Sequence, residues 1–292
     1  MRGKILNIAI MLVLLTGAAA YLLTAPKRVD VATFAGLTGD AAHGAQVFNA
    51  AGCASCHTAP DAQRSDRPIL SGGRTFPSDF GTFRAPNISP DLAEGIGAWS
   101  VIDLANAMMH GTSPEGQHYY PAFPYTTYTR AAPQDIADLF AYLKTLPPSA
   151  TPSQPHDVGF PFNIRRALGG WKLLFFRDTW ITPATPEAER GRYLVEALGH
   201  CGECHTPRNA LGGLDYANWL TGAPNPSGKG KIPNITPAVL DWSEADLVEY
   251  FTSGFTPDYD SAGGEMAEVV QNLSKLPVED RQAIAAYLKS LP

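Results

Sequence analysis

The sequence is poor in charged residues and in sulfur. Lys, Arg, Asp and Glu make up 17% of the 292 residues, and 28 acidic against 22 basic residues give a net charge of −6. A nucleic-acid-binding face needs clustered Lys and Arg, so this balance excludes one. Only four cysteines occur. The length is sufficient for two domains of ordinary size.

Segments with the alternating pattern of β-strands are also scarce, whereas helical periodicity is clear. In residues 136–143, apolar residues recur at i, i+3, i+4 and i+7, which predicts a helix with one face packed on a core. Ser100 and Ser243 precede two further apolar segments in the position of an N-cap. The connections are rich in glycine and proline. The sequence therefore predicts an all-α fold with irregular connections.

All four cysteines lie in two C-x-x-C-H pentapeptides, Cys53-Ala54-Ser55-Cys56-His57 and Cys201-Gly202-Glu203-Cys204-His205. This pattern attaches a c-type haem, because the two thiols form thioether bonds with vinyl groups and the histidine is placed to bind the iron. A structural zinc site would need four ligands at each position, and a redox dithiol would need a βαβ context that is absent. We therefore predict two covalently bound haem c groups, held by Cys53, Cys56 and His57 and by Cys201, Cys204 and His205.

Residues 1–28 are predicted to be a membrane anchor or a signal peptide. After Arg2 and Lys4, an uncharged run from Ile5 to Leu23 is long enough to span a bilayer as a helix. Cleavage after Ala18-Ala19-Ala20 is the alternative. We favour the uncleaved anchor, with its basic end in the cytoplasm. Because haem is attached to C-x-x-C-H outside the cytoplasmic membrane, both alternatives place the bulk of the chain in the periplasm.

The segments around the two pentapeptides are copies of one another. Gly44 and Gly191 stand at matching positions before them, and Pro-Asn-Ile-Ser/Thr-Pro follows them at Pro86 and Pro233. Both copies close with Ala-Tyr-Leu-Lys and Leu-Pro. The second copy carries one extra residue before its first cysteine. A duplication of this length is typical of separate domains and not of a solenoid repeat.

The duplication predicts one domain at residues 38–148 and a second at 183–292. Residues 149–182 between them begin with a proline-rich linker and contain the apolar segment Trp171-Lys172-Leu173-Leu174-Phe175-Phe176, which is too short to span a membrane. We interpret this amphipathic segment as a helix that packs across both domains. Docking to a partner or to the membrane surface is the alternative.

A methionine in the second copy is placed to bind the open face of its haem. Met266 follows the helix that begins after Trp242, in a predicted loop between the two closing helices. A thioether ligand raises the reduction potential relative to histidine. We predict that Met266 binds the second iron, with core packing as the alternative.

The first copy has Phe123 in the corresponding position, and phenylalanine cannot bind iron. The first haem is therefore either five-coordinate or bound by another side chain. Met108, on the inward stripe of the preceding helix, is the first choice, and its alternative role is core packing. His118, in the loop near Phe123, is the second choice. Histidines without a surrounding motif are interpreted as surface or loop residues: His43, His156 and His200.

Short helices before and after C-x-x-C-H resemble class I cytochrome c over nearly all of residues 38–148 and 183–292. The segments from Tyr120 to Tyr125 and from Gly264 to Val270, with the paired Pro-Asn-Ile motifs, resemble the dihaem cytochrome c subunits of bacterial membrane-bound dehydrogenases. The resemblance implies two tandem cytochrome c domains after an N-terminal transmembrane helix. It also implies that the carbonyls of the prolines at 86 and 233 accept the proximal imidazole N–H; a simple turn is the alternative.

The resemblance further implies an electron-transfer protein and not an enzyme. It would accept electrons from a dehydrogenase and pass them to a quinone, a cytochrome or an oxidase at the periplasmic side of the inner membrane. A haem with both axial positions filled leaves no place for substrate. The alternative is a haem enzyme, of the dihaem peroxidase or thiosulfate-oxidising type, that uses an open first haem.

Overall fold

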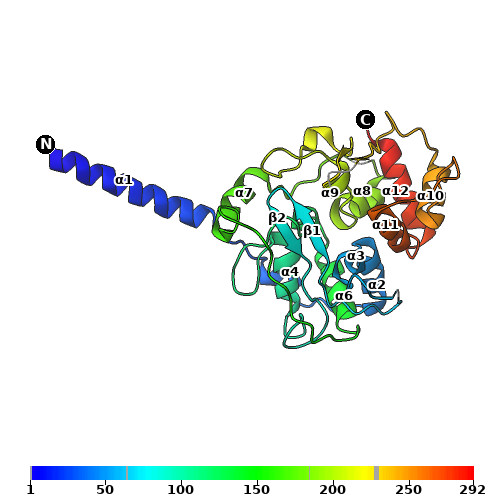
Figure 1. The fold of residues 1–292 in the computed structure, drawn as a ribbon, viewed down its shortest axis with the longest axis horizontal. Helices are drawn as coiled ribbons and strands as arrows, with labels where there is room; N and C mark the ends of the chain where they lie inside the picture. The colour runs from blue at the N-terminus through cyan, green and yellow to red at the C-terminus, as the bar shows by residue number, and fades with distance from the viewer. Residues whose placement is uncertain (1, 64, 184, 227–229) are drawn as a thin grey trace.

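The N-terminal helix α1 (Arg2–Leu23) extends away from the rest of the chain (Figure 1). The computed structural model describes residues 2–63, 65–183, 185–226 and 230–292. The predicted N-terminal segment and both predicted domains therefore include residues outside the described ones, namely 1, 64, 184 and 227–229. None of the residues of α1 is buried, and the helix is long and apolar enough to cross a membrane.

Helices carry most of the regular structure of the first copy. In chain order the elements are η1 (Val31–Phe34), α2 (Ala41–Ala50), α3 (Cys53–His57), β1 (Thr75–Ser78), β2 (Gly81–Arg84), α4 (Val101–His110), α5 (Tyr125–Tyr128) and α6 (Pro133–Leu143). The predicted N-cap is confirmed, because the Ser100 hydroxyl accepts the Asp103 N–H while the Asp103 carboxylate accepts the Ser100 N–H. The apolar face of α6 packs against α2.

The same order of elements recurs in the second copy. It contains α8 (Glu189–Tyr193), the π-helical turn η3 (Leu194–Leu198), α9 (Cys201–His205), η4 (Tyr216–Asn218), β3 (Ala223–Pro224), β4 (Lys231–Ile232), α10 (Glu244–Ser253), α11 (Glu265–Leu273) and α12 (Val278–Ser290). Ser243 and Asp246 form a second capping box. A π-helical turn holds one more residue than an α-helical turn would, so η3 accommodates the extra residue that the sequence shows before Cys201.

Two glycines allow the terminal helices of each copy to cross in backbone contact. A Cβ at Gly44 in α2 would overlap the carbonyl oxygen of Asp138 in α6, and a Cβ at Gly191 in α8 would overlap that of Ala283 in α12. The matching glycines of the sequence therefore have the same structural role, which is close approach of two helices.

A single apolar cluster runs through both copies. It includes Phe48 and Ile136 of the first copy and Leu194, Leu247 and Ile284 of the second. The chain between the copies forms η2 (Arg165–Ala167) and α7 (Leu168–Phe175). Within the described residues the strands are confined to two short antiparallel hairpins, β1–β2 and β3–β4. The predicted all-α class is thus confirmed.

Candidate haem-binding sites

Each C-x-x-C-H pentapeptide forms one short helix, α3 in the first copy and α9 in the second. Residues three apart on a helix lie on the same face, so both thiols of a pentapeptide point to one side. The residue before each helix adopts a left-handed conformation, with φ of 62° at Gly52 and 42° at His200. The chain thus turns sharply into each motif, and the histidine at its end enters the domain.

The two motif histidines are held in the same way. The Nδ1–H of His57 donates to the carbonyl of Pro86 at 2.9 Å, and that of His205 donates to the carbonyl of Pro233 at 2.8 Å. The expected proline partners are thereby confirmed. A hydrogen bond at Nδ1 fixes the ring orientation and leaves Nε2 as the nitrogen that can bind a metal. Burial also lowers the pKa of both imidazoles, which favours the neutral form that a metal ligand needs.

The cysteine environments fit covalent attachment and not a redox dithiol. Burial raises the pKa of the thiols of Cys53 and Cys201 to about 12 and that of Cys56 to about 11. Reactive dithiols need a lowered thiol pKa. A zinc site is also unsupported, because neither pentapeptide belongs to a group of three or more converging metal ligands among the described residues. The donor set in each copy, two thiols and one oriented imidazole, is that of a haem c site.

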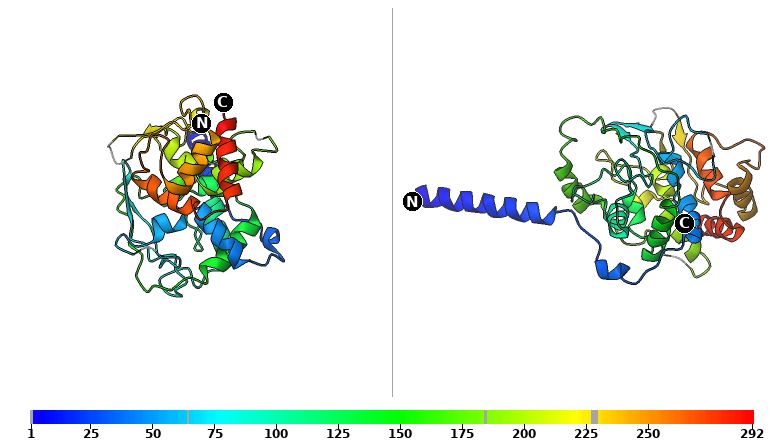
Figure 2. Two further views of the ribbon diagram at one scale, coloured as in Figure 1. Left: turned by 90° about the vertical axis from the view of Figure 1, so that its right-hand side faces the viewer. Right: turned by 90° about the horizontal axis from the view of Figure 1, so that it is seen from below.

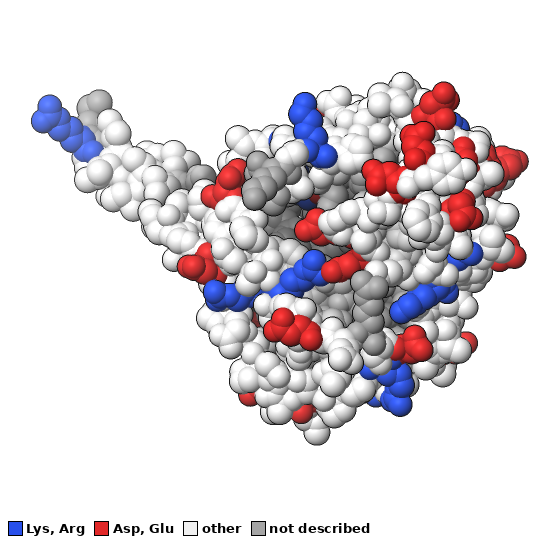
Figure 3. All heavy atoms as spheres, turned by 45° about the vertical axis from the view of Figure 1, so that its right-hand side comes forward, with Lys and Arg blue, Asp and Glu red and all other residues white. Residues whose placement is uncertain are grey.

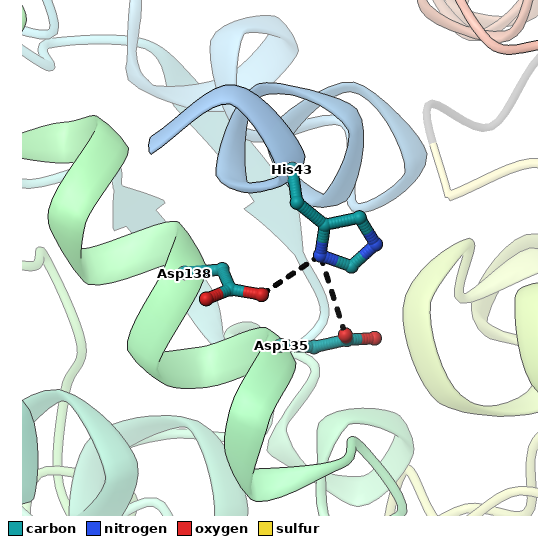
Figure 4. A group of neighbouring side chains, drawn as sticks. All are labelled: His43, Asp135 and Asp138. Atoms are coloured by element: carbon teal, nitrogen blue, oxygen red, sulfur yellow. Dashed lines mark hydrogen bonds and ion pairs between the residues drawn. The ribbon is translucent and has the colours of Figure 1, made fainter. Parts of the chain in front are cut away.

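One other group of potential ligands exists in the described part of the chain, formed by His43 of α2 with Asp135 and Asp138 of α6 (Figure 4). The Nδ1 of His43 lies 2.8 Å from Asp138 and 3.7 Å from Asp135. Asp138 also accepts hydrogen bonds from the Asp40 N–H and Gln134, and Asp135 accepts one from Tyr193. Protein donors thus satisfy these carboxylates, and the group ties helices together. The 40% exposure of the His43 side chain agrees with its interpretation as a surface residue, and its imidazole is held by Asp138.

The predicted sixth ligand of the second haem lies at the start of a helix. Met266 is the second residue of α11, and the chain enters that helix through Gly264, which has a φ of 56°. The sequence predicted that Met266 lies in a loop. This prediction was wrong, because α11 begins at Glu265, directly after Gly263 and Gly264. Its side chain is half-buried, and α11 lies between α10 and α12 in the chain, as expected.

The candidates for the sixth ligand of the first haem are in different surroundings. Met108 is 3% exposed and belongs to the apolar cluster. His118 is also buried, but its Nε2–H donates to the carbonyl of Thr24 at 3.0 Å, next to α1. Burial lowers the pKa of His118 to about 4. Binding of iron through Nε2 would require this bond to break. Phe123 is half-buried, with its ring 5.7 Å from that of Tyr128.

Changing Met108 to leucine tests the first of these candidates. If Met108 is the ligand, Met108→Leu removes one thioether–iron signal from the near-infrared magnetic circular dichroism of the oxidised protein, while His118→Gln leaves both haem signals unchanged. The leucine has a similar volume, so its cost in stability should stay below about 1.5 kcal/mol. A Met108→Leu spectrum identical to wild type would assign Met108 to core packing.

The two motif helices meet where the copies contact each other. His200, which directly precedes α9, donates from Nε2 to the carbonyl of Ala51 at 3.2 Å. Ala51 is followed by Gly52, the residue directly before α3. The Tyr128 hydroxyl donates to the same carbonyl at 3.1 Å. His200 lies in the irregular connection before α9, as its interpretation as a surface or loop residue predicts, and its side chain is engaged at the contact between the copies.

Further contacts at this interface are reciprocal. Ser55 and Glu203 occupy the same position in the two pentapeptides. Ser55 Oγ accepts a hydrogen bond from Asn272 of α11 at 2.8 Å, and Glu203 accepts one from Thr126 of α5 at 2.7 Å. Because α5 follows Phe123 and α11 contains Met266, each motif helix is bonded to the segment beside the predicted distal position of the other copy. The interface therefore fixes the two cofactor sites relative to each other.

An ion pair completes the contact between the first motif helix and α11. Arg74 Nη1 lies 2.6 Å from Glu268 Oε2 and donates to the carbonyl of Ser55 at 2.5 Å. Both side chains of the pair are about a third exposed, so solvent weakens their attraction. The pair orients α3 and α11 relative to each other more than it stabilises the fold, because it joins the backbone of α3 to the helix that contains Met266.

The comparisons with known proteins agree with this geometry. The sequence profile of the cytochrome c family matches residues 41–147 and 188–292, more than half of the chain. A diheme cytochrome c-type protein of Cereibacter sphaeroides is 62% identical over 289 residues, which cover 98% of each chain. The fructose dehydrogenase cytochrome subunit of Gluconobacter japonicus is 38% identical, with 83% of this chain and 51% of the relative covered.

A third relative is the gluconate 2-dehydrogenase cytochrome c subunit of Pantoea cypripedii, which is 35% identical, with 89% of this chain and 62% of the relative covered. The chain thus spans nearly all of the Cereibacter protein and between half and two thirds of these two dehydrogenase subunits. Together with the two matched C-x-x-C-H helices, these similarities show that the chain belongs to the cytochrome c family and carries two covalently bound haem c groups.

Proposed function

We propose that this dihaem cytochrome accepts single electrons from a dehydrogenase and passes them to the respiratory chain at the periplasmic face of the inner membrane. The observation that carries the proposal is the pair of matched motif helices, each with its imidazole held by a proline carbonyl. Named relatives are cytochrome subunits of dehydrogenases. When bound, each haem supplies an iron that cycles between Fe(III) and Fe(II).

The orientation of the two motif histidines supports an assignment of the residues at the two haem sites. We assign Cys53, Cys56 and His57 to the first haem and Cys201, Cys204 and His205 to the second, with Met266 as the distal ligand of the second. The reciprocal contacts of the motif helices support direct transfer between the two haems, because they hold both attachment sites at one interface.

The charge distribution favours an electron partner with a basic docking face. No Lys or Arg occurs between Lys231 and Lys275, whereas this segment contains eight acidic residues, including Glu265 beside Met266. One of the eight, Glu268, is paired with Arg74. Figure 3 shows acidic side chains gathered on one side of the body. Opposite charges on two surfaces accelerate their encounter and orient it. We propose that the acceptor, a quinone-linked protein, a cytochrome or an oxidase, approaches this side.

A role as a haem enzyme has less support. A peroxidase needs an iron with an open position for peroxide, and the buried Met108 offers the first haem a thioether that would close it. None of the relatives named above is a peroxidase. We therefore propose that the chain is an electron-transfer subunit, and that catalysis belongs to its partner dehydrogenase.

Membranes of the native host with and without this chain test the proposal. We expect one class of substrate (alcohols, sugar acids or aldehydes) to reduce the c-type haem of wild-type membranes. Oxygen uptake with that substrate should fall to background in the deletion strain and return when the chain is restored. Unchanged oxygen uptake with every substrate that the membranes oxidise would overturn the proposal. Rapid turnover of hydrogen peroxide by the purified protein would favour the enzyme alternative.

A further inference from the structure

The chain between the two copies leaves large apolar side chains exposed. Leu173 and Leu174 of α7 are 57% and 69% exposed, and Phe160 before them is 82% exposed. Ile164, directly before η2, is 47% exposed. Large apolar side chains that are exposed together on one short segment mark an interaction site on a soluble protein more often than scattered single ones do. We call Phe160, Ile164, Leu173 and Leu174 the linker patch.

The linker patch belongs to a segment that is bonded directly to the end of α1. The Arg166 guanidinium donates to the carbonyls of Tyr21 and Thr24 and lies over the Tyr21 ring, 4.5 Å from its centroid. A Cβ at Gly169, in the first turn of α7, would overlap the Thr24 carbonyl oxygen. Figure 1 and Figure 2 show α7 beside the point where α1 meets the body. The position of α7 is therefore fixed relative to α1.

The length of α1 sets the depth of this junction. Its 22 residues extend about 33 Å at 1.5 Å per residue, close to the roughly 30 Å of a bilayer's hydrocarbon core. Arg2 and Lys4 lie at one end, and Tyr21, an aromatic residue of the kind enriched at membrane surfaces, lies at the other. When α1 spans the bilayer, residues 21–24 thus lie at its outer surface. Leu173, four residues beyond Gly169, is then only about 6 Å farther along α7.

We propose that the linker patch rests on the lipid bilayer beside α1, with Leu173 and Leu174 in the headgroup region. The inference rests on the proposed membrane location of the chain. A short helix with exposed leucines and neighbouring arginines has the composition of an interfacial helix. Lipid is the chosen occupant because the patch continues directly from the end of the membrane-spanning helix.

Contact with lipid at α7 would orient both haem sites, because α7 is bonded to both copies. Trp171 Nε1–H donates to the Leu211 carbonyl of the second copy at 2.8 Å. Lys172 Nζ donates to the Gly111 carbonyl of the first copy at 2.9 Å. The helix therefore packs across both copies, as interpreted from the sequence, and its outer face is free for the membrane. A fixed tilt of the body would hold the electron entry and exit sides at constant heights above the bilayer.

Photolabelling of the full-length holoprotein in lipid nanodiscs tests the proposal. A lipid-soluble aryl diazirine is activated in the bilayer, and adducts are located by mass spectrometry. We expect adducts in α1 and at Leu173 and Leu174, and none at Tyr259 or Leu92, which are 93% and 75% exposed. A water-soluble diazirine should give the opposite pattern at these four positions.

The outcomes distinguish docking of the linker patch on the bilayer from insertion of α1 into it. Adducts in α1 without adducts at Leu173 and Leu174 would overturn the docking of the patch while leaving the anchor intact, whether water or another protein covers α7. Leu174→Asp should lower the α7 adducts, whereas Leu92→Asp should not, and neither should change the haem spectrum because both side chains are exposed. Labelling of α7 that is unaffected by Leu174→Asp would also contradict the proposal. Failure of the electron-transfer role would appear separately, in the oxygen uptake of membranes.

Discussion

Replacing Met266 by phenylalanine is expected to lower the reduction potential of the second haem by roughly 0.1–0.3 V, within the range of about 0.8 V over which axial ligands set haem potentials. The substitution removes the thioether, which favours Fe(II), and gives the second copy the residue that the first copy has at Phe123. Because Met266 is half-buried at the start of α11, the larger ring should be tolerated.

A redox titration followed by visible spectroscopy measures this effect, and near-infrared magnetic circular dichroism checks the ligand. One of the two potentials should fall while the other stays within error, since the interface residues around the first motif are untouched. Met109→Phe is the matched control: it makes the same change at another half-buried methionine, and both potentials should be retained. Two unchanged potentials in Met266→Phe would show that Met266 only packs the core.

The parts of the fold that the sequence predicted well are set by neighbouring residues. The capping boxes at Ser100 and Ser243 each need a serine and an aspartate three residues apart, and the pentapeptide helices need five consecutive residues. Comparison of the two copies made further residues predictable. It singled out Gly44 and Gly191, and the resemblance to cytochrome c supplied the roles of Pro86 and Pro233. The residues that hold the motif histidines were therefore predictable.

The contact between the copies was not predictable, because its residues lie far apart in the chain. Asn272 and Ser55 are separated by 217 positions and Thr126 and Glu203 by 77, and no local pattern connects them. The extra residue before Cys201 was visible in the sequence. Its consequence, the π-helical turn that precedes His200, can be seen only in the structure. The hairpins were missed because their strands are short, with four residues each in β1 and β2 and two each in β3 and β4, too few for a clear alternating pattern.

The iron ligand of the first haem could not be predicted from the sequence for a different reason. The sequence indicates that Phe123 has replaced a possible ligand, and the structure adds that Met108 is buried in the apolar cluster and that His118 is bonded to Thr24. The bond of His118 to Thr24 favours Met108 over His118 as the ligand. Burial of a methionine is equally compatible with packing, however, because a thioether is apolar. Spectroscopy of the Met108→Leu protein is therefore the direct measurement.

Replacing Gly191 by alanine is expected to destabilise the second copy by about 3 kcal/mol, the upper range for overpacking of a tight contact. The sign of this change in stability is informative, because alanine normally stabilises a helix interior relative to glycine by roughly 0.5–1 kcal/mol. At Gly191 the new Cβ would overlap the carbonyl oxygen of Ala283 and crowd Tyr287. The backbone of α12 cannot yield as a flexible side chain would, so α8 and α12 must separate.

That separation would disturb a buried hydrogen-bond network. The Tyr287 hydroxyl donates to Glu196 at 2.7 Å and accepts from Trp219 at 3.1 Å. Urea unfolding of the holoprotein measures the loss of stability, and the pyridine haemochrome assay measures haem bound per chain, which should drop toward one. Gly170→Ala is the control, because Gly170 lies in α7 with open space around its Cβ position, and it should be neutral or stabilising. If both variants gained stability equally, α8 and α12 would not cross in backbone contact, and the matched glycines would need another explanation.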